Sequence, residues 1–564
     1  MDRVQGLVSV ALAAFLVGCG GGGGGGRNPS PGPTTPPPTP TPTAALTAQT
    51  GPMPLQLAWL DETALTVTGN VSWTNLPAGV YVVATDLGNY LGPTKALQVT
   101  TAGAFSLSMA GDPALAPGNY SGSVTVQACQ DSACAKPFTN TAVTLPYSLV
   151  VSPVDEWSTY QRTPGHNAYV PITLNPSRFA LKWKWNTTDS LGAPLFEQGP
   201  NLPAVTNGEA VFTVTDMYRQ PAYVFAVEKS TGRPLWSRSV GMTWSINPPA
   251  VSDGIVYVAT SGLFLDRATN TYVYDNSYLW AFSATNGSVV FKSPYPTSWA
   301  SPHFFGAPTV ADGVVYINGG EFALQGFAFD AKTGAQRWAK DVFNQPMGMT
   351  TPTVLNGRVF NAGTGGLFEM SRTDGSRVAT VPNGFADFST EAFGTAAVAS
   401  SDGGIVALAG SAAPSGFPHQ NSIGWGSKRA ITRYATNPLA LSWASGALYD
   451  STPVVANGVV YAYRQDPAQL DAVDEATGQV LWSWPLPVAE GIFFRDNMIV
   501  TRNILFFNTN TGLKAFDLKT RSIVWRLTLE NCNGWDACYG NISMSADRIL
   551  FLTRSWNILA ISLR

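Results

Sequence analysis

Cysteines and histidines are the side chains of this sequence with the widest scope for metal or covalent chemistry. Cys19 stands alone, and the other four cysteines form two closely spaced pairs, Cys129 with Cys134 and Cys532 with Cys538. A zinc site needs four converging ligands, but the pairs lie in distant segments and the chain has only three histidines. Disulfides within each pair, formed in an oxidising compartment, are therefore predicted in preference to a metal site.

The remaining candidates for catalysis are weak. His166, His303 and His419 are far apart, and neither a phosphate-binding glycine loop nor a nucleophile elbow occurs in the sequence. The formal net charge is -3, without a basic cluster, which excludes the electrostatic footprint of a nucleic-acid binder. We expect no enzymatic activity and no cofactor.

Cys19 follows an apolar stretch, Val4 to Val17, that is too short to span a bilayer. The sequence Leu-Val-Gly-Cys at 16–19 resembles the lipobox of bacterial lipoproteins. That resemblance implies a signal peptide at 1–18, lipidation of Cys19 and, since glycine follows the cysteine, an outer-membrane anchor in the cell envelope. An ordinary signal peptide with a chance cysteine is the alternative.

Two segments precede the main body of the chain. Residues 19–51, rich in glycine and then in proline, are predicted to be a tether. Residues 52–153 contain about seven short alternating stretches separated by turn residues, of which Gly118–Cys129 is the clearest. This pattern resembles the immunoglobulin-like β-sandwich modules of bacterial surface proteins.

A two-part unit recurs from residue 203 to the end. Its first part is a strand, a tight turn and a strand, as in PTVADGVVY (308–316), and most copies are about 44 residues apart. Its second part, as in AVDEATGQVLW (472–482), is a strand, a turn with glycine and a strand that usually ends in tryptophan. The tryptophans are Trp236, Trp338, Trp443, Trp482 and Trp525.

Four strands per unit, repeated radially, predict an all-β, eight-bladed β-propeller over 154–564. The last unit is one strand short, and FALKWKW at 179–185 is expected to complete it. The second part resembles the docking motif of the PQQ-type β-propeller repeat. In that family the tryptophan packs between neighbouring blades, so the resemblance implies blade-docking roles for the five tryptophans.

The resemblance leaves several functions open. The family includes quinone-dependent dehydrogenases with a disulfide between adjacent cysteines, but this chain has no Cys-Cys pair and no Cys-x-x-Cys-His haem site. It also includes the lipoprotein subunit of the outer-membrane β-barrel assembly machinery, which binds protein. We expect a non-enzymatic scaffold for envelope proteins, a monomer within a complex; a quinone dehydrogenase and a carbohydrate-binding propeller are the alternatives.

Connections between predicted strands supply the candidate binding face. Long insertions at 259–278 and 410–430 fall on the face opposite the Thr-Gly turns. Aromatic anchors dominate binding sites, and the candidates on this face are Trp244, Trp299, Phe304, Phe305 and Trp535. The alternative is that these aromatics fill the centre of the ring or pad its blades.

Overall fold

The structure is a computed structural model. It describes residues 40–563 apart from 59–62, 193–203, 216–220, 244, 262–263, 267–270, 274–276, 296–305, 320–324, 343–350, 364–365, 383–395, 410–428, 450, 466, 487–497, 510, 529–540, 546 and 554–556. The described part of the chain is almost entirely β-structure, with one 3-10 turn, η1 (Pro176–Arg178), and one short helix, α1 (Thr187–Leu191).

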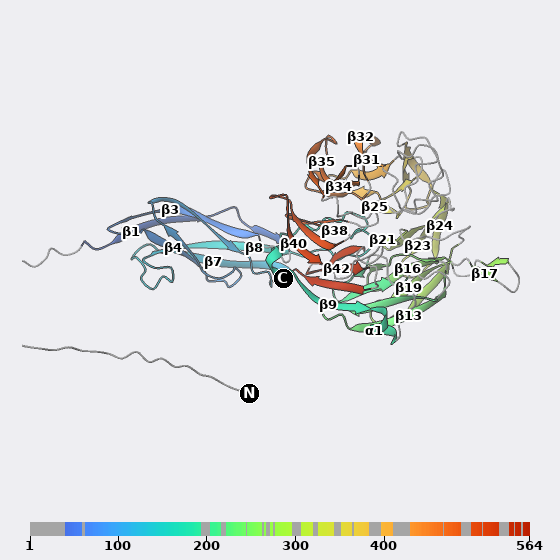
Figure 1. The fold of residues 1–564 in the computed structure, drawn as a ribbon, viewed down its shortest axis with the longest axis horizontal. Coiled ribbons are helices and arrows are strands. Elements are labelled where there is room, and N and C mark those ends of the chain that lie inside the picture. The colour runs from blue at the N-terminus through green and yellow to red at the C-terminus, as the bar shows by residue number, and fades with distance from the viewer. Residues whose placement is uncertain are drawn as a thin grey trace, which may run out of the picture.

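Two sheets with a common core form the N-terminal domain, drawn in blue in Figure 1. One sheet has the order β1 (Thr43–Thr50), β3 (Ala64–Thr74), β6 (Gly103–Ala110); the other has the order β2 (Leu55–Ala58), β8 (Val143–Ser152), β7 (Gly118–Cys129), β4 (Val80–Asp86), β5 (Lys95–Val99). Alternation buries one face of each strand, as Phe105, Leu107 and Met109 of β6 show. A disulfide joins Cys129 to Cys134 at the end of β7.

The predicted tether, 19–51, extends too far into the folded domain. Residues 43–50 form β1, which pairs with β3 along its whole length. Ala44, Leu46 and Ala48 pack against the sandwich core, and the intervening residues face away from it. Because threonine, alanine and glutamine fill this strand, its composition resembles the preceding linker and hides the alternation.

Within the described residues, eight sheets of four or five strands follow one another after the N-terminal domain, in the region of the β-propeller repeats. We number them in chain order. Sheet 1 contains β10 (Val205–Thr206), β11 (Ala210–Val214), β12 (Pro221–Glu228) and β13 (Pro234–Met242); sheet 2 contains β14 (Ser245–Ile246), β15 (Ala250–Ser252), β16 (Ile255–Ser261), β19 (Tyr278–Ser283) and β20 (Val289–Pro294); sheet 3 contains β21 (Thr309–Ala311), β22 (Val314–Asn318), β23 (Gln325–Asp330) and β24 (Gln336–Asp341); sheet 4 contains β25 (Thr353–Leu355), β26 (Arg358–Gly363), β27 (Gly366–Met370) and β28 (Arg377–Val381).

The second half repeats this plan. Sheet 5 contains β29 (Val398–Ala399), β30 (Ile405–Ala409), β31 (Arg429–Thr436) and β32 (Leu439–Tyr449); sheet 6 contains β33 (Val454–Ala456), β34 (Val459–Gln465), β35 (Ala468–Asp474) and β36 (Val480–Pro485); sheet 7 contains β37 (Ile499–Val500), β38 (Ile504–Thr509), β39 (Gly512–Asp517) and β40 (Ser522–Thr528); sheet 8 contains β41 (Ile542–Ser545), β42 (Arg548–Thr553), β43 (Asn557–Ser562) and β9 (Ala180–Asn186). The inner strands of successive sheets lie next to one another, from β10 to β41.

Sheet 8 closes the propeller with strands from both ends of the repeat region. β9 pairs antiparallel with β43, as the sequence predicts. A register shift interrupts this pairing at Ala560/Ile561, and the outermost pairing of each other sheet carries a shift at the equivalent place. Trp183 and Trp185 of β9 share a buried cluster with Val211 and Phe225 of sheet 1. The last sheet therefore packs on the first.

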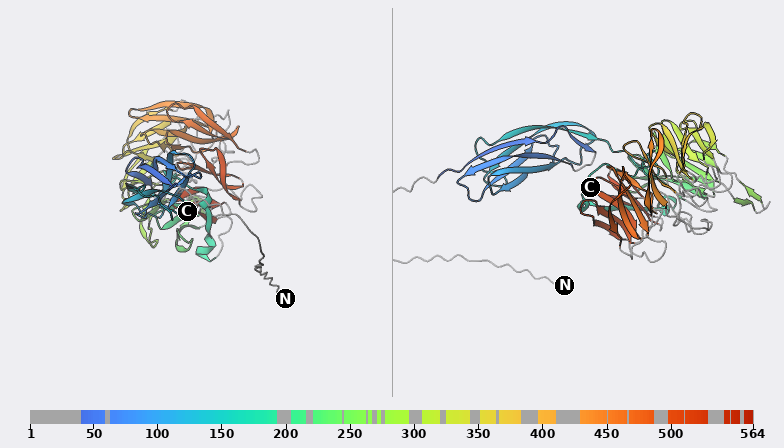
Figure 2. Two further views of the ribbon diagram at one scale, coloured as in Figure 1. Left: turned by 90° about the vertical axis from the view of Figure 1, so that its left-hand side faces the viewer. Right: turned by 90° about the horizontal axis from the view of Figure 1, so that it is seen from above.

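The two faces of the propeller differ in what lies beyond them. The N-terminal domain lies at one end of the molecule, and the hairpin of β17 (Phe264–Asp266) and β18 (Thr271–Val273) lies at the other (Figures 1 and 2). This hairpin belongs to the predicted insertion 259–278. Among the residues described, no helix is long and apolar enough to cross a membrane.

Candidate functional site

The docking tryptophans lie at the seams between sheets. Each of three donates its indole N–H to a carbonyl in the outer turn of the next sheet: Trp236 to Ala284 at 2.9 Å, Trp338 to Arg372 at 3.0 Å and Trp443 to Glu475 at 3.0 Å. Trp183 of β9 makes the same bond to Lys229 at 3.0 Å. The closing strand therefore supplies a sixth docking tryptophan and ties sheet 8 to sheet 1.

Three further seams use variations of this contact. Trp482 contacts Phe516 of sheet 7, with 6.1 Å between ring centroids, and Trp525 meets Phe179 edge-on at 5.6 Å. Where Phe291 replaces the tryptophan, the Ala331 carbonyl of sheet 3 accepts a hydrogen bond from the Tyr257 hydroxyl at 2.8 Å. The acceptor is thus satisfied even where the indole is missing, as expected of a buried carbonyl.

The glycine of the Thr-Gly turn contacts the docking indole ring of the preceding sheet. Gly478 has φ +73°, and a Cβ there would lie 2.7 Å from Cδ2 of Trp443. Aspartate in the same phrase holds the turn: Asp474 Oδ1 accepts the Thr477 amide at 2.8 Å and its hydroxyl at 2.7 Å. The repeated phrase is therefore used to join sheets.

Charged side chains cross three of these seams, from the residue whose carbonyl accepts the indole. Arg372 pairs with Asp312 at 2.9 Å, and Glu475 lies 3.4 Å from Nε of Arg433. Lys229, almost fully buried, bridges Glu156 at 3.3 Å and Asp547 at 3.5 Å. The repeat pattern does not identify the partners in these pairs. It does show a charged residue at the same turn position in three sheets, Lys229, Arg372 and Glu475, and this recurrence is a signal for them.

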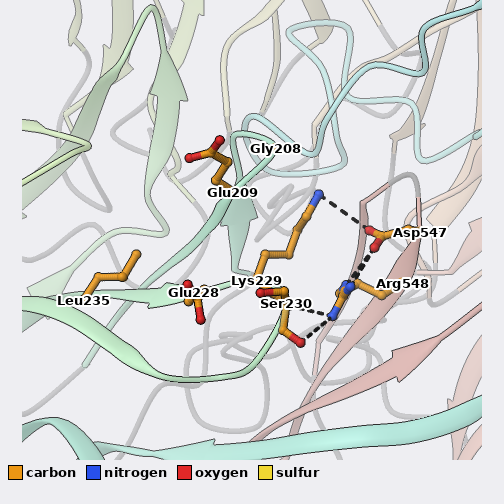
Figure 3. Close-up of a pocket in the computed structure, with 8 residues that line it drawn as sticks. All are labelled: Gly208, Glu209, Glu228, Lys229, Ser230, Leu235, Asp547 and Arg548. Atoms are coloured by element: carbon orange, nitrogen blue, oxygen red, sulfur yellow. Dashed lines mark hydrogen bonds and ion pairs between the residues drawn. The ribbon is translucent and has the colours of Figure 1, made fainter. Parts of the chain in front are cut away.

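A pocket of about 420 Å³ opens where sheet 1 meets sheet 8 (Figure 3). Its lining comes from Gly208, Glu209, Glu228, Lys229, Ser230, Leu235, Asp547 and Arg548. Arg548 holds the seam by donating to the Lys229 carbonyl at 2.6 Å and to Asp547 Oδ2 at 2.6 Å. The charged groups of Lys229 and Arg548 are thus both engaged with Asp547.

Asp547 is the most perturbed carboxyl of this seam. Burial raises its pKa, but the hydrogen bond from Arg548 and the charges of Lys229 and Arg548 outweigh burial and lower the pKa to about 2. The carboxylate is therefore ionised at neutral pH and stabilises the contact between the first and last sheets.

The five aromatic candidates for the binding face lie outside the described residues. This holds for Trp244, Trp299, Phe304, Phe305 and Trp535, and also for Cys19, Cys532, Cys538, His303 and His419. Tyr449, the last residue of β32, is described, and it is fully buried with its hydroxyl 3.0 Å from Asp471 of sheet 6. Tyr449 therefore packs between sheets 5 and 6.

His166 is fully buried, with Nδ1 2.6 Å from the Tyr160 carbonyl and Nε2 2.8 Å from the Pro352 carbonyl. Burial lowers its pKa. Within the described residues, no three His, Cys, Asp or Glu side chains converge as metal ligands would. His166 is therefore a structural residue in this fold.

Comparison with known proteins identifies the family of the chain. A family model described as outer membrane protein assembly factor BamB matches residues 180–294, 275–413 and 419–563. The chain belongs to this family. The match covers all eight sheets of the BamB-type propeller and leaves the N-terminal domain outside it.

Solved structures similar to this BamB-type chain include the following. BamB from Moraxella catarrhalis is 12% identical over 68% of this chain and 99% of its own, with a TM-score of 0.48. Quinohemoprotein alcohol dehydrogenase ADHIIG from Pseudomonas putida HK5 is 13% identical, covering 72% and 80%, with a TM-score of 0.45. A europium-containing methanol dehydrogenase is 13% identical, covering 70% and 89%, with a TM-score of 0.37. No curated protein matched the sequence.

The residues of this chain do not fit the quinone site that the family resemblance implies. That site uses a disulfide between adjacent cysteines, and the five cysteines include no adjacent pair. The described disulfide, Cys129–Cys134, lies in the N-terminal domain.

Proposed function

We propose that this BamB-type protein is a lipid-anchored, non-enzymatic scaffold of the cell envelope that binds envelope proteins through the loop-rich face of its propeller. In this proposal the eight sheets are eight blades of one ring, the N-terminal domain is an immunoglobulin-like spacer, and the protein acts as a monomer within a complex. The family description, an assembly factor of outer membrane proteins, supports a protein-binding role.

One observation carries the proposal: the repeated motif is used for the architecture of the ring. Tryptophan, glycine and aspartate of the motif contact neighbouring sheets or their own turn. Recognition is thus left to the connections on the opposite face, which vary in length. Propellers present extended loop surfaces of this kind as binding sites.

The position of the N-terminal domain relative to the propeller also supports the loop-rich face as the binding face. The Thr-Gly turns lie on the side where the chain enters the propeller from the N-terminal domain, since Glu156 contacts Lys229 of such a turn. The β17–β18 hairpin extends from the opposite end (Figures 1 and 2). A protein anchored through Cys19 would present this far face to a partner.

Alanine substitutions test the proposal. Trp244→Ala, Trp299→Ala and Trp535→Ala are compared with Thr333→Ala and Thr477→Ala. These two controls change exposed residues on the face that carries the Thr-Gly turns, which we call the turn face. The measurement is crosslinked capture of envelope proteins by variants of confirmed fold. A tryptophan that is a hot spot contributes about 2 kcal/mol or more, so its loss should reduce capture more than tenfold.

Equal capture by all five variants would reject the loop-rich face. An absorbance spectrum of the purified protein tests the alternative function, because a bound quinone would favour the dehydrogenase.

A further inference from the structure

The segment from Glu156 to Leu174, which we call the strap, joins the N-terminal domain to the propeller and runs along the inner ends of its sheets. Five sheets bond to its backbone carbonyls. The backbone amides of the sheets donate to these carbonyls as follows: Thr206 to Trp157 at 2.9 Å, Val251 to Ser158 at 2.7 Å, Val354 to Pro164 at 2.8 Å, Ala399 to Gly165 at 2.7 Å and Val500 to Ala168 at 3.1 Å. The strap therefore visits sheets 1, 2, 4, 5 and 7 in chain order.

Side chains of the strap reach the two sheets that its backbone carbonyls leave out. Thr159 donates to the Pro308 carbonyl of sheet 3 at 2.8 Å, and Nε2 of His166 lies 3.0 Å from the Thr309 hydroxyl. Asn167 pairs twice with Val455 of sheet 6, donating to its carbonyl at 2.8 Å and accepting from its amide at 3.2 Å. Seven sheets are thus bonded directly.

The eighth sheet is reached through Lys229. Glu156, at the start of the strap, and Asp547 of sheet 8 both contact the Lys229 ammonium. The strap consequently touches the seam at which the propeller closes.

The strap is buried like a ligand. Trp157, His166 and Ile172 are fully buried, and Ala168 and Val170 lie within the main core. Gly165 lies so close to sheet 5 that a Cβ there would be 2.8 Å from that of Ala399. Among the described strands, none pairs with the axial edge of the inner strands. The carbonyls of the strap therefore supply the hydrogen-bond acceptors that buried inner-strand amides need.

We propose that the mouth of the propeller on the turn face is a binding site for an extended peptide, and that the strap is its resident ligand. Recognition resembles strand addition, in which main-chain hydrogen bonds supply the affinity. The N-terminal domain is then held to the propeller by the strap's non-covalent contacts as well as by the continuous chain, and this mouth is closed to other peptides.

Two variants of the full-length protein, each cut at a single place, test this proposal. A protease site is inserted after Ser177, behind the strap, or after Pro153, ahead of it; all residues flanking both cuts except Val154 are exposed. The cut behind the strap should leave both fragments together in size-exclusion chromatography, whereas the cut ahead of it should release the N-terminal domain. Release after both cuts overturns the proposal. Retention after both cuts also overturns it, since other contacts would then hold the fragments.

A matched pair of variants locates the affinity in the strap. In protein cut after Ser177, Asn167→Ala removes two bonds to sheet 6 and should raise the dissociation constant of the fragments at least tenfold. Asn175→Ala, in the same linker, loses only contacts with Ser177 and should change it less than twofold. Equal effects of the two variants would contradict a strap that binds through its hydrogen bonds to the inner strands.

Discussion

At the scale of single residues, two constraints require glycine in the Thr-Gly turn. Gly478 needs a left-handed backbone and also lies against the ring of Trp443, whereas Gly458 of the same sheet, with φ +77°, has open space where a Cβ would go. Gly458→Ala should cost about 1–2 kcal/mol for backbone strain. Gly478→Ala should cost about 1–3 kcal/mol more, because the added methyl displaces the indole.

Thermal unfolding of the two variants measures this difference. The melting midpoint should fall further for Gly478→Ala than for Gly458→Ala. Equal midpoints would mean that the docking ring does not press on the turn.

Asp547 makes stability depend on pH in acid. Its pKa in the folded protein is about 2, below the ordinary value of 3.8, so its stabilising contribution is complete above pH 4 and is lost as pH falls towards 2. The difference corresponds to about 2 kcal/mol. Asp547→Asn should therefore lose about that much stability at pH 6 and show a smaller further loss between pH 4 and pH 2.

Asp253→Asn is the control, since Asp253 is an exposed residue in the corresponding turn of sheet 2. Denaturant unfolding across this pH range compares the variants with the native protein. If Asp547→Asn and Asp253→Asn follow the same profile, the seam carboxylate is not a stabilising group.

Residue roles could be predicted from the sequence only where the repeat marks them. Recurrence identifies Trp236, Trp338 and Trp443, because tryptophan returns at the same position in most units. It does not identify Lys229, whose partners Glu156 and Asp547 lie 73 and 318 positions away and outside the motif. Such contacts depend on how the sheets close in space.

At the scale of elements, the closing strand is defined by its register. Ala180 of β9 faces Ser562 of β43, and both are at least partly exposed. Directly opposed residues of an antiparallel pair lie within the range that a disulfide spans. Ala180→Cys combined with Ser562→Cys should therefore form a bond that joins the two ends of the ring and raises the melting midpoint under oxidising conditions only.

Leu181→Cys with Ser562→Cys is the off-register control, because neighbouring residues of a strand point to opposite faces. Crosslinking is followed by mobility on non-reducing gels. Equal crosslinking of the two pairs would show that β9 does not hold this register.

The sequence predicts elements well where polar and apolar residues alternate and where turns punctuate them. β7 and β9 lie within a residue of their predicted bounds. β1 was missed because small residues weaken its alternation, and the strap was missed because a segment without a repeat gives no periodic signal. The course of the strap along the inner strands is set by hydrogen bonds to residues that are distant in the sequence, some of them more than 300 positions away.

At the scale of the whole molecule, the proposed anchor, spacer and propeller lie in series. The chain leaves the anchor at Cys19, passes through the N-terminal domain and enters the propeller on its turn face through the strap, so the loop-rich face is the part farthest along this series. This arrangement gives a purpose to the long linker only if Cys19 is lipidated. Metabolic labelling with an alkyne fatty acid should therefore mark the native protein, and intact mass should show an acylated chain that begins at Cys19. Cys19→Ser should abolish the label, whereas Cys129→Ser, which removes a folded-domain cysteine, should retain it. Labelling that persists in Cys19→Ser, or a native protein without label, would refute the anchor while leaving the propeller and its binding face to be tested separately.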